Sequence, residues 1–211
     1  MAYRQTDRTR RRAEEKQVAF LGAALDLVAL HGFAGAKVSA IAQACHASTG
    51  SLYSYFDSRE DLLAAVFREV ADRELTAVGR AVAEAPASPT ERLDALIRTF
   101  TRRALRGRRM AWSLLFEPVA PAVEAERLVY RRAYVELGEG IIRDGITEGA
   151  FAPQNATVAS SAVIGAISEA LVGRLGPIEP DAVSGMSDEL LVAEIRDFCF
   201  RALGRPSATP S

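Results

Sequence analysis

The sequence predicts an all-α protein of about nine helices, in which a small N-terminal three-helix unit precedes a larger helical domain. Long alternating runs of β-branched residues, which are typical of strands, are missing, whereas Ala, Leu, Glu and Arg are abundant. Apolar residues recur at spacings of three and four. Capping residues, glycines and prolines then divide the chain into segments of helical length.

The first helix is expected over residues 11–31. Its apolar positions Phe20, Ala24 and Val28 lie on one helical face. Gly32 follows as a C-terminal stop, because glycine readily adopts the backbone conformation that ends a helix.

Two short helices follow and are joined by a tight turn. Ser39 is expected to cap a helix that ends near Cys45. The connection His46–Ala47 is too short for anything but a sharp turn. Ser48 is expected to cap a second helix that ends near Phe56, and two such helices braced by the first make a helix-turn-helix.

Six further helices are expected after this unit. Ser58 and Asp61 form a capping box at the start of the first of them, and the prolines of the PASP segment separate the first from the second. The expected ranges are residues 58–84, 90–106, 110–117, 121–148, 155–175 and 188–203. We therefore expect a helix-turn-helix domain, called the head, over residues 1–56 and a second domain over residues 57–211.

Charge is distributed unevenly along the chain. The net charge is −1, but residues 1–56 hold seven Lys and Arg against four Asp and Glu, and the remainder carries −4. Residues 1–10 are expected to form a basic, disordered arm. A basic end on an acidic body suits a protein that touches a polyanion with one part, although a solvated tail has the same composition.

The segment ASTGSLYSYF, residues 47–56, has two unlike halves. Its first turn carries only small side chains, so its backbone can approach a base edge or a phosphate. Thr49 and Ser51 supply hydroxyls for bases, and the Tyr53 hydroxyl can reach a phosphate. The apolar half would pack on the first helix: Leu52, Tyr55 and Phe56.

The order of these features over residues 16–70 resembles the tetracycline-repressor (TetR) family of transcriptional regulators. The shared features are Gly-Phe after the first helix, Val-Ser and Ile-Ala at the second, then Ser-x-Gly-Ser-Leu-Tyr-x-Tyr-Phe and x-Ser-Arg-Glu-x-Leu. The resemblance implies an all-helical protein with an N-terminal DNA-binding domain and a C-terminal domain for effector binding and dimerisation.

The resemblance also implies roles for single residues. Thr49, Gly50 and Ser51 would approach bases. Arg59 would contact phosphate from the start of the fourth helix. The other residues implied to bind DNA are Ser39, Ser48, Tyr53 and Ser54. His46 stands where the family tends to have glycine. We therefore expect His46 to adopt a positive φ, which histidine tolerates better than most residues.

Two aromatic pairs are candidates for the effector pocket. Trp112 and Phe116 are spaced i, i+4 in one helix, and Tyr130 and Tyr134 have the same spacing in another. Ordinary core packing explains such pairs equally well. An anionic ligand could meet nearby arginines, but the residues do not name the ligand.

The last two helices are expected to form the dimer interface. The final helix carries an apolar stripe, Leu191, Ile195, Phe198 and Ala202. The preceding helix presents small residues that let helices approach closely, Ala162, Gly165, Ala166 and Ala170. Packing within one chain is the alternative explanation of both patterns.

These observations predict a cytoplasmic, homodimeric transcriptional regulator, most simply a repressor released from a palindromic double-stranded DNA operator by a small molecule. We find no signal peptide and no apolar run of membrane-spanning length, so no membrane is expected. No metal site and no cofactor are expected, since Cys45 and Cys199 lack ligand-like spacing. The rival classes are a helical enzyme and an architectural DNA-binding protein, and no residue grouping looks catalytic.

Overall fold

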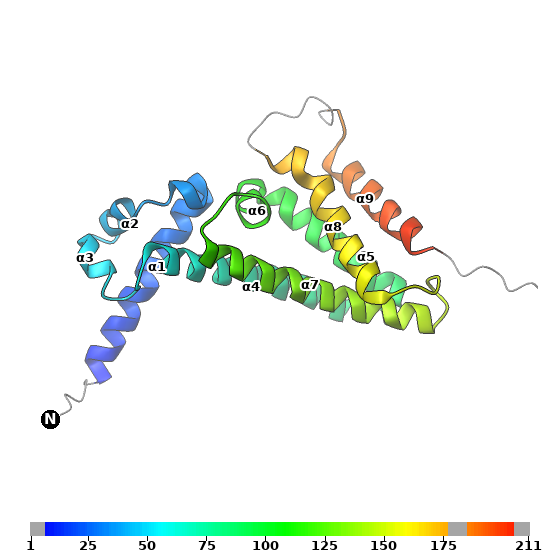
Figure 1. Cartoon of the computed structure of the whole chain (residues 1–211), viewed down its shortest axis with the longest axis horizontal. Helices are drawn as coiled ribbons and strands as arrows, with labels where there is room; N and C mark the ends of the chain where they lie inside the picture. The colour runs from blue at the N-terminus through cyan, green and yellow to red at the C-terminus, as the bar shows by residue number, and fades with distance from the viewer. Residues whose placement is uncertain (1–6, 177–184, 205–211) are drawn as a thin grey trace, which may run out of the picture. The chain divides into compact units, whose positions relative to one another are not determined.

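The computed structural model describes residues 7–176 and 185–204, and these residues form helices and turns without a strand. The all-α fold class is confirmed (Figure 1). The described helices are α1 (Asp7–Gly35), α2 (Val38–Ala44), α3 (Thr49–Leu52), α4 (Arg59–Glu84), α5 (Pro89–Arg106), α6 (Arg108–Leu115), α7 (Pro121–Thr147), α8 (Ala156–Leu175) and α9 (Asp188–Leu203).

Three local expectations were wrong at helix boundaries. Helix α1 begins at Asp7, so residues 7–10 of the expected arm are helical, while residues 1–6 lie outside the described residues. Ser39 lies inside α2, whose N-cap is Lys37 and has no side-chain cap. Helix α3 ends at Leu52, because the N–H groups of Tyr55 and Phe56 both donate to the Leu52 carbonyl and tighten the chain into a turn.

The chain divides into two compact units. Unit 1 comprises the residues up to Glu69 together with Glu117–Glu126, and unit 2 comprises Val70–Phe116 and the residues from Arg127 onward. This division differs from a boundary after residue 56. The first turns of α4 belong to unit 1 because they complete its core, where the rings of Phe33 and Phe67 stack with centroids 6.1 Å apart.

The core of unit 1 holds α3 against α1. Phe20 and Val28 of α1, Ile41 of α2 and Leu52 of α3 are all buried. The Phe20 ring lies 5.8 Å from that of Tyr55, so the residues after α3 also pack on α1. A buried apolar residue on each helix fixes the orientation of the short helix α3, which four residues alone could not maintain.

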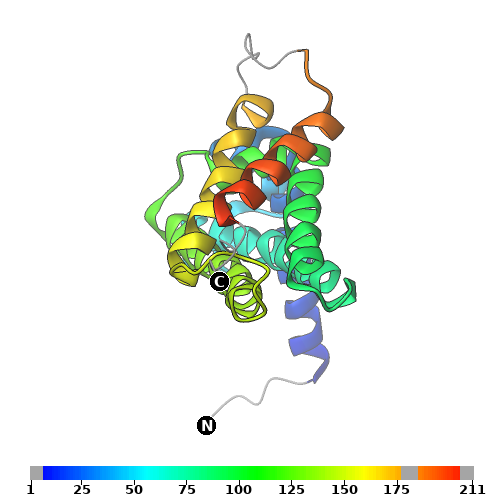
Figure 2. The same ribbon diagram turned by 90° about the vertical axis from the view of Figure 1, so that its right-hand side faces the viewer.

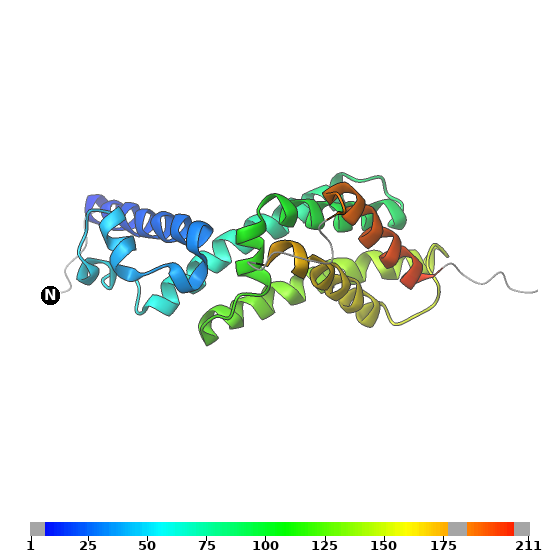
Figure 3. The same ribbon diagram turned by 90° about the horizontal axis from the view of Figure 1, so that it is seen from above.

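The core of unit 2 is built around α5, which contacts α8 and α9 (Figures 2 and 3). Leu93, Leu96 and Ile97 of α5 are buried, as are Ile167 and Leu171 of α8. Burial also raises the pKa of the Cys199 thiol to about 11, as expected for a core cysteine.

Two helices are long and apolar enough to cross a membrane by length and composition alone, which corrects the expectation that no such run exists. Among the described residues they are Arg10–Gly35, which contains an 18-residue window with a mean hydropathy of 1.7, and Ala156–Leu175, which contains one with 1.5. The described structure gives both another role. Helix α1 contributes Phe20 and Val28 to the core of unit 1, and α8 contributes Ile167 and Leu171 to that of unit 2.

Candidate nucleic-acid interface

The turn between α2 and α3 has the predicted backbone. His46 has φ of 49°, the one non-glycine residue with a positive φ in the described chain. The Ala47 N–H donates to the Ala42 carbonyl at 2.9 Å, which closes the turn onto α2. Ser48 then caps α3, with its Oγ accepting from the Ser51 N–H at 3.1 Å. Both expectations for this turn are confirmed.

Substitution of His46 should follow this backbone conformation. We expect His46→Gly to be neutral or stabilising, since glycine adopts positive φ without steric cost. His46→Val should lower the free energy of unfolding by ~1–2 kcal/mol, because a β-branched side chain clashes in the left-handed region. Chemical denaturation followed by circular dichroism measures both variants. An equal loss of stability in the two would show that the side chain, and not φ, determines the effect.

The polar half of the α3 segment faces solvent and the apolar half faces the core. Ser48, Thr49 and Gly50 are exposed, and Tyr53 is 49% exposed. Leu52, by contrast, is 0% exposed. The first turn of α3 therefore exposes hydroxyls and backbone groups, while the buried Leu52 anchors the helix to the core. A helix must present such a surface to enter a DNA groove.

Ser51 and Ser54, two further predicted contact residues, also have hydrogen bonds inside the unit. The Ser51 side chain is half-buried, and its backbone N–H is engaged by the Ser48 cap. The Ser54 hydroxyl donates to the Gly50 carbonyl at 3.3 Å. Ser39 is exposed on the first turn of α2, beside the exposed Lys37. The roles of these residues in DNA contact stay predictions.

Sequence reasoning missed two exposed residues of α2 and its cap. Lys37 is the N-cap of α2, and Gln43 lies in its last turn. Both side chains are of types that contact phosphates or bases. The available signal was composition, since Lys37 is one of only two lysines in the chain and stands immediately before the Val-Ser pair.

Arg59 has a different environment from the one the resemblance implied. Its Nη2 donates to the Phe33 carbonyl at 2.7 Å and its Nε donates to the Ala36 carbonyl at 3.3 Å. The side chain is only 31% exposed, and Nη1 lies 3.8 Å from a carboxylate oxygen of Glu60. The guanidinium therefore joins α4 to the corner between α1 and α2, and its contact with a DNA phosphate stays a prediction.

Removal of this side chain should destabilise the head as well as weaken DNA binding. We expect Arg59→Ala to lower the free energy of unfolding of unit 1 by ~1–3 kcal/mol, because two buried carbonyls lose a charged donor. Arg59→Lys should recover only part of the lost free energy of unfolding, since one ammonium group cannot reproduce the planar guanidinium that donates to both carbonyls. Calorimetric melting of the two variants measures the difference. If Arg59→Ala left the melting temperature unchanged but lowered DNA affinity, Arg59 would act only as a phosphate contact.

The four aromatic residues expected to surround an effector fall into separate contacts of unit 2. The rings of Trp112 and Phe116 lie 5.4 Å apart. Tyr134 packs edge-on against Phe100 with centroids 5.1 Å apart. The Tyr130 hydroxyl instead donates to Asp72 at 2.6 Å on the surface of α4. Tyr130 therefore belongs to a surface contact, while the other three rings pack against the core.

Tyr134 lies beside an ion pair between α4 and α5. Burial raises the pKa of its phenol, and the nearby Glu74 carboxylate raises that pKa further. Glu74 itself accepts from Nη2 of Arg103 at 2.8 Å, and this bond raises the pKa of Arg103. Tyr134 therefore stays a neutral hydroxyl in the interior at physiological pH.

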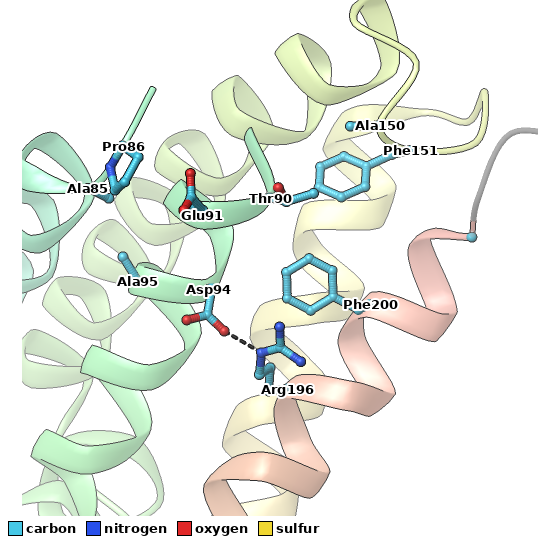
Figure 4. Close-up of a pocket in the computed structure, with 11 residues that line it drawn as sticks. Ala85, Pro86, Thr90, Glu91, Asp94, Ala95, Ala150, Phe151, Arg196 and Phe200 are labelled. Atoms are coloured by element: carbon cyan, nitrogen blue, oxygen red, sulfur yellow. Dashed lines mark hydrogen bonds and ion pairs between the residues drawn. The ribbon is translucent and has the colours of Figure 1, made fainter. Parts of the chain in front are cut away.

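An open groove of about 630 Å³ lies elsewhere in unit 2, between the start of α5 and the end of α9 (Figure 4). Asp94 and Arg196 form an ion pair in its wall, and Phe151 and Phe200 contribute rings with centroids 6.3 Å apart. None of the four residues predicted for the effector pocket lines this groove. The effector site over those four residues stays a prediction.

The exposed face of α8 and α9 carries part of the predicted dimer interface. Phe198 is 54% exposed and Leu190 is 48% exposed, and both lie on the outward face of α9. Ala162 and Ala170 of α8 and Ala202 of α9 are exposed, and Gly165 and Ala166 are half-buried. Leu191 and Ile195 are buried within their own chain, as the alternative of packing within one chain expects, and their part in a dimer interface stays a prediction.

Two family models match this sequence. The model of bacterial regulatory proteins of the tetR family matches residues 20–66, which contain the α2–turn–α3 segment. The model of the tetracyclin repressor-like C-terminal domain matches residues 86–171. The two matches together cover more than half of the chain. The chain belongs to the TetR family of transcriptional regulators. No curated protein sequence matches it significantly.

Several solved structures have the same fold. A TetR/AcrR-family regulator from Thermobifida fusca is 25% identical, with a TM-score of 0.68 over 90% of this chain and 100% of that one. FadR from Bacillus subtilis, in complex with stearoyl-CoA, is 20% identical, with a TM-score of 0.70 over 89% and 97%. AibR, in complex with isovaleryl coenzyme A and operator DNA, is 23% identical, with a TM-score of 0.67 over 88% and 98%.

Proposed function

We propose that this TetR-family regulator is a homodimeric repressor that binds a palindromic operator and is released by a small molecule. The observation that carries the proposal is the exposed, small-residue first turn of α3, held on a buried core by Leu52 and completed by the His46 turn. Such a turn brings backbone and hydroxyl groups to base edges without steric conflict. The proposed readers of sequence are Thr49, Gly50 and Ser51.

A dimer supplies the second half of the operator contact. Phe198 and Leu190 expose large apolar surface on α9, and the neighbouring face of α8 is built of small residues. Two copies that pack through these faces around a two-fold axis form a four-helix interface. The two heads then bind half-sites one helical turn apart, so the operator is palindromic.

Release by an effector follows from a shift between two conformations of unit 2. A ligand that binds the conformation with the wrong head spacing lowers operator affinity by the same factor by which DNA lowers ligand affinity. We propose acyl-CoA thioesters as the first class to test, because two proteins of this fold were solved with such ligands. Three exposed arginines of α5 and α6 supply positive charge for the phosphates of such a ligand: Arg102, Arg106 and Arg109.

A footprint on the DNA upstream of the protein's own gene tests the proposal. We expect one short protected palindrome at nanomolar protein, a light-scattering mass of two chains, and loss of protection when the effector is added. A panel of short, branched and long acyl-CoA thioesters is the probe, with free coenzyme A as the control. Uniform protection of all DNA would instead support the architectural class, and a mass of one chain would refute the dimer.

A further inference from the structure

A buried carboxylate from a distant part of the sequence holds the corner between α1 and α2 in unit 1. Glu117, which follows α6 after one residue, is only 9% exposed. Its two carboxylate oxygens accept from the Phe33 N–H at 3.0 Å and from the Ala34 N–H at 2.9 Å. A buried carboxylate that accepts two backbone N–H groups makes strong, charge-assisted hydrogen bonds with fixed geometry.

The corner is shaped to receive this carboxylate. Gly32 interrupts α1 with φ of 72° and ψ of 179°, which turns the next two N–H groups away from the helix ladder. A Cβ at Gly32 would lie 2.6 Å from one Glu117 oxygen and 2.7 Å from the other. The site therefore requires a residue without a side chain, and the Gly-Phe pair of the sequence has its explanation here.

Arg59 also holds this corner, with a positive charge in place of the negative one. Glu117 accepts from the N–H of Phe33, while Arg59 donates to the carbonyl of Phe33. One residue of the corner thus has its two backbone groups bonded to two side chains of opposite charge. The corner immediately precedes α2, so its geometry sets the direction from which α2 and α3 leave α1.

The chain before Glu117 is also fixed, within unit 2. Arg127, 8% exposed, donates from Nε to the Leu114 carbonyl at 2.8 Å and from Nη2 to the Ser113 carbonyl at 3.2 Å. These bonds cap the end of α6. Only Leu115 and Phe116 separate the capped carbonyls from Glu117, and the chain passes from unit 2 to unit 1 at this point.

We propose that Glu117 is a positioning residue for operator binding: its carboxylate holds the α1–α2 corner within unit 1 and so fixes the orientation of α3 on α1. The inference rests on the proposed function, since orientation matters only if two heads must meet two spaced half-sites. Because Glu117 is buried, we do not expect it to contact a base. Its loss should leave the groups of α3 that face DNA unchanged while widening the range of orientations that α2 and α3 take on α1.

The test compares Glu117→Gln with Glu136→Gln. Both variants remove one negative charge, but Glu136 is exposed on α7 and serves as the matched control. Glutamine keeps the size of the side chain, yet its NH₂ group faces one of the two backbone donors. We expect the Phe33 and Ala34 amides of Glu117→Gln to exchange hydrogen about 10–100-fold faster than in the wild type. Glu136→Gln should exchange as the wild type does.

The DNA measurement distinguishes positioning from mere stabilisation. Affinities are measured for the operator, for versions with half-sites moved apart or together by one base pair, and for random DNA. Glu117→Gln should bind the operator less well and lose most of the preference for correct spacing, with affinity for random DNA changed less than about twofold. Glu117→Asp keeps the charge on a shorter side chain. Its operator affinity and its preference for correct spacing should lie between those of the wild type and of Glu117→Gln.

Three outcomes overturn the inference. Wild-type exchange at both amides in Glu117→Gln would show that the carboxylate does not hold the corner. Faster exchange with equal loss of affinity for every DNA would show that Glu117 only stabilises the fold. If the wild-type protein has no spacing preference, the repressor proposal fails first and this inference fails with it.

Discussion

Phe198→Asp should convert the proposed dimer to monomers and abolish operator binding. The side chain is 54% exposed in the single chain, so aspartate there costs the fold of the monomer little. In the proposed dimer the same position meets the small-residue face of α8. An aspartate would then be buried without a partner, and the two-fold axis repeats the penalty in each copy. Light scattering and anisotropy with operator DNA measure mass and affinity on the same sample.

Leu128→Asp is the matched control for this variant. Leu128 is equally exposed, at 57%, but lies on α7, outside the proposed interface. The Leu128→Asp variant should remain dimeric and bind the operator as the wild type does. Leu191→Asp should behave differently from both, because Leu191 is buried and a charge there unfolds unit 2. If Phe198→Asp still has a mass of two chains, another surface forms the dimer.

Gly32→Ala should strongly destabilise unit 1. The backbone at φ of 72° and ψ of 179° is open to glycine and strained for every other residue. The added Cβ would also displace the Glu117 carboxylate, whose oxygens lie within 3 Å of it. We expect the free energy of unfolding of unit 1 to fall by ~3 kcal/mol, with loss of operator binding.

Gly22→Ala gives the matched comparison within the same helix. Gly22 is exposed, and a Cβ there would meet no atom within 4 Å. Alanine should therefore stabilise α1 by ~0.5–1 kcal/mol through its helix propensity. Calorimetric melting of the two alanine variants beside the wild type measures both effects. A melting profile for Gly32→Ala that matches the wild type would contradict the account of this corner.

The features that could be predicted from the sequence depend on local chemistry. Ser48 and Ser58 accept hydrogen bonds three residues ahead in the chain, and His46 occupies a two-residue turn, so spacing alone indicates their roles. The number of helices followed from proline and glycine positions. The burial of Leu52 and Phe56 followed from their spacing against an exposed polar half.

The features that were missed depend on interactions between distant segments. Glu117 and Phe33 are 84 residues apart, and no local pattern connects them. Arg59 matched a phosphate-contacting position of the family, but its guanidinium is engaged by the carbonyls of a corner whose shape the sequence does not show. Leu191 and Ile195 share a helical stripe with Phe198, and only the position of α5 determines which members of that stripe are buried.

We propose that α3 reads DNA sequence through uncharged groups at its first turn. A salt titration of operator and random DNA with the double variant Thr49→Ala, Ser51→Ala tests it most directly. We expect the free-energy preference for operator over random DNA to fall by ~1–3 kcal/mol for each hydroxyl that reads a base. The salt slope should stay unchanged, since no charge is removed. Equal weakening of both DNAs, or an unchanged preference, would contradict the claim that these residues specify sequence.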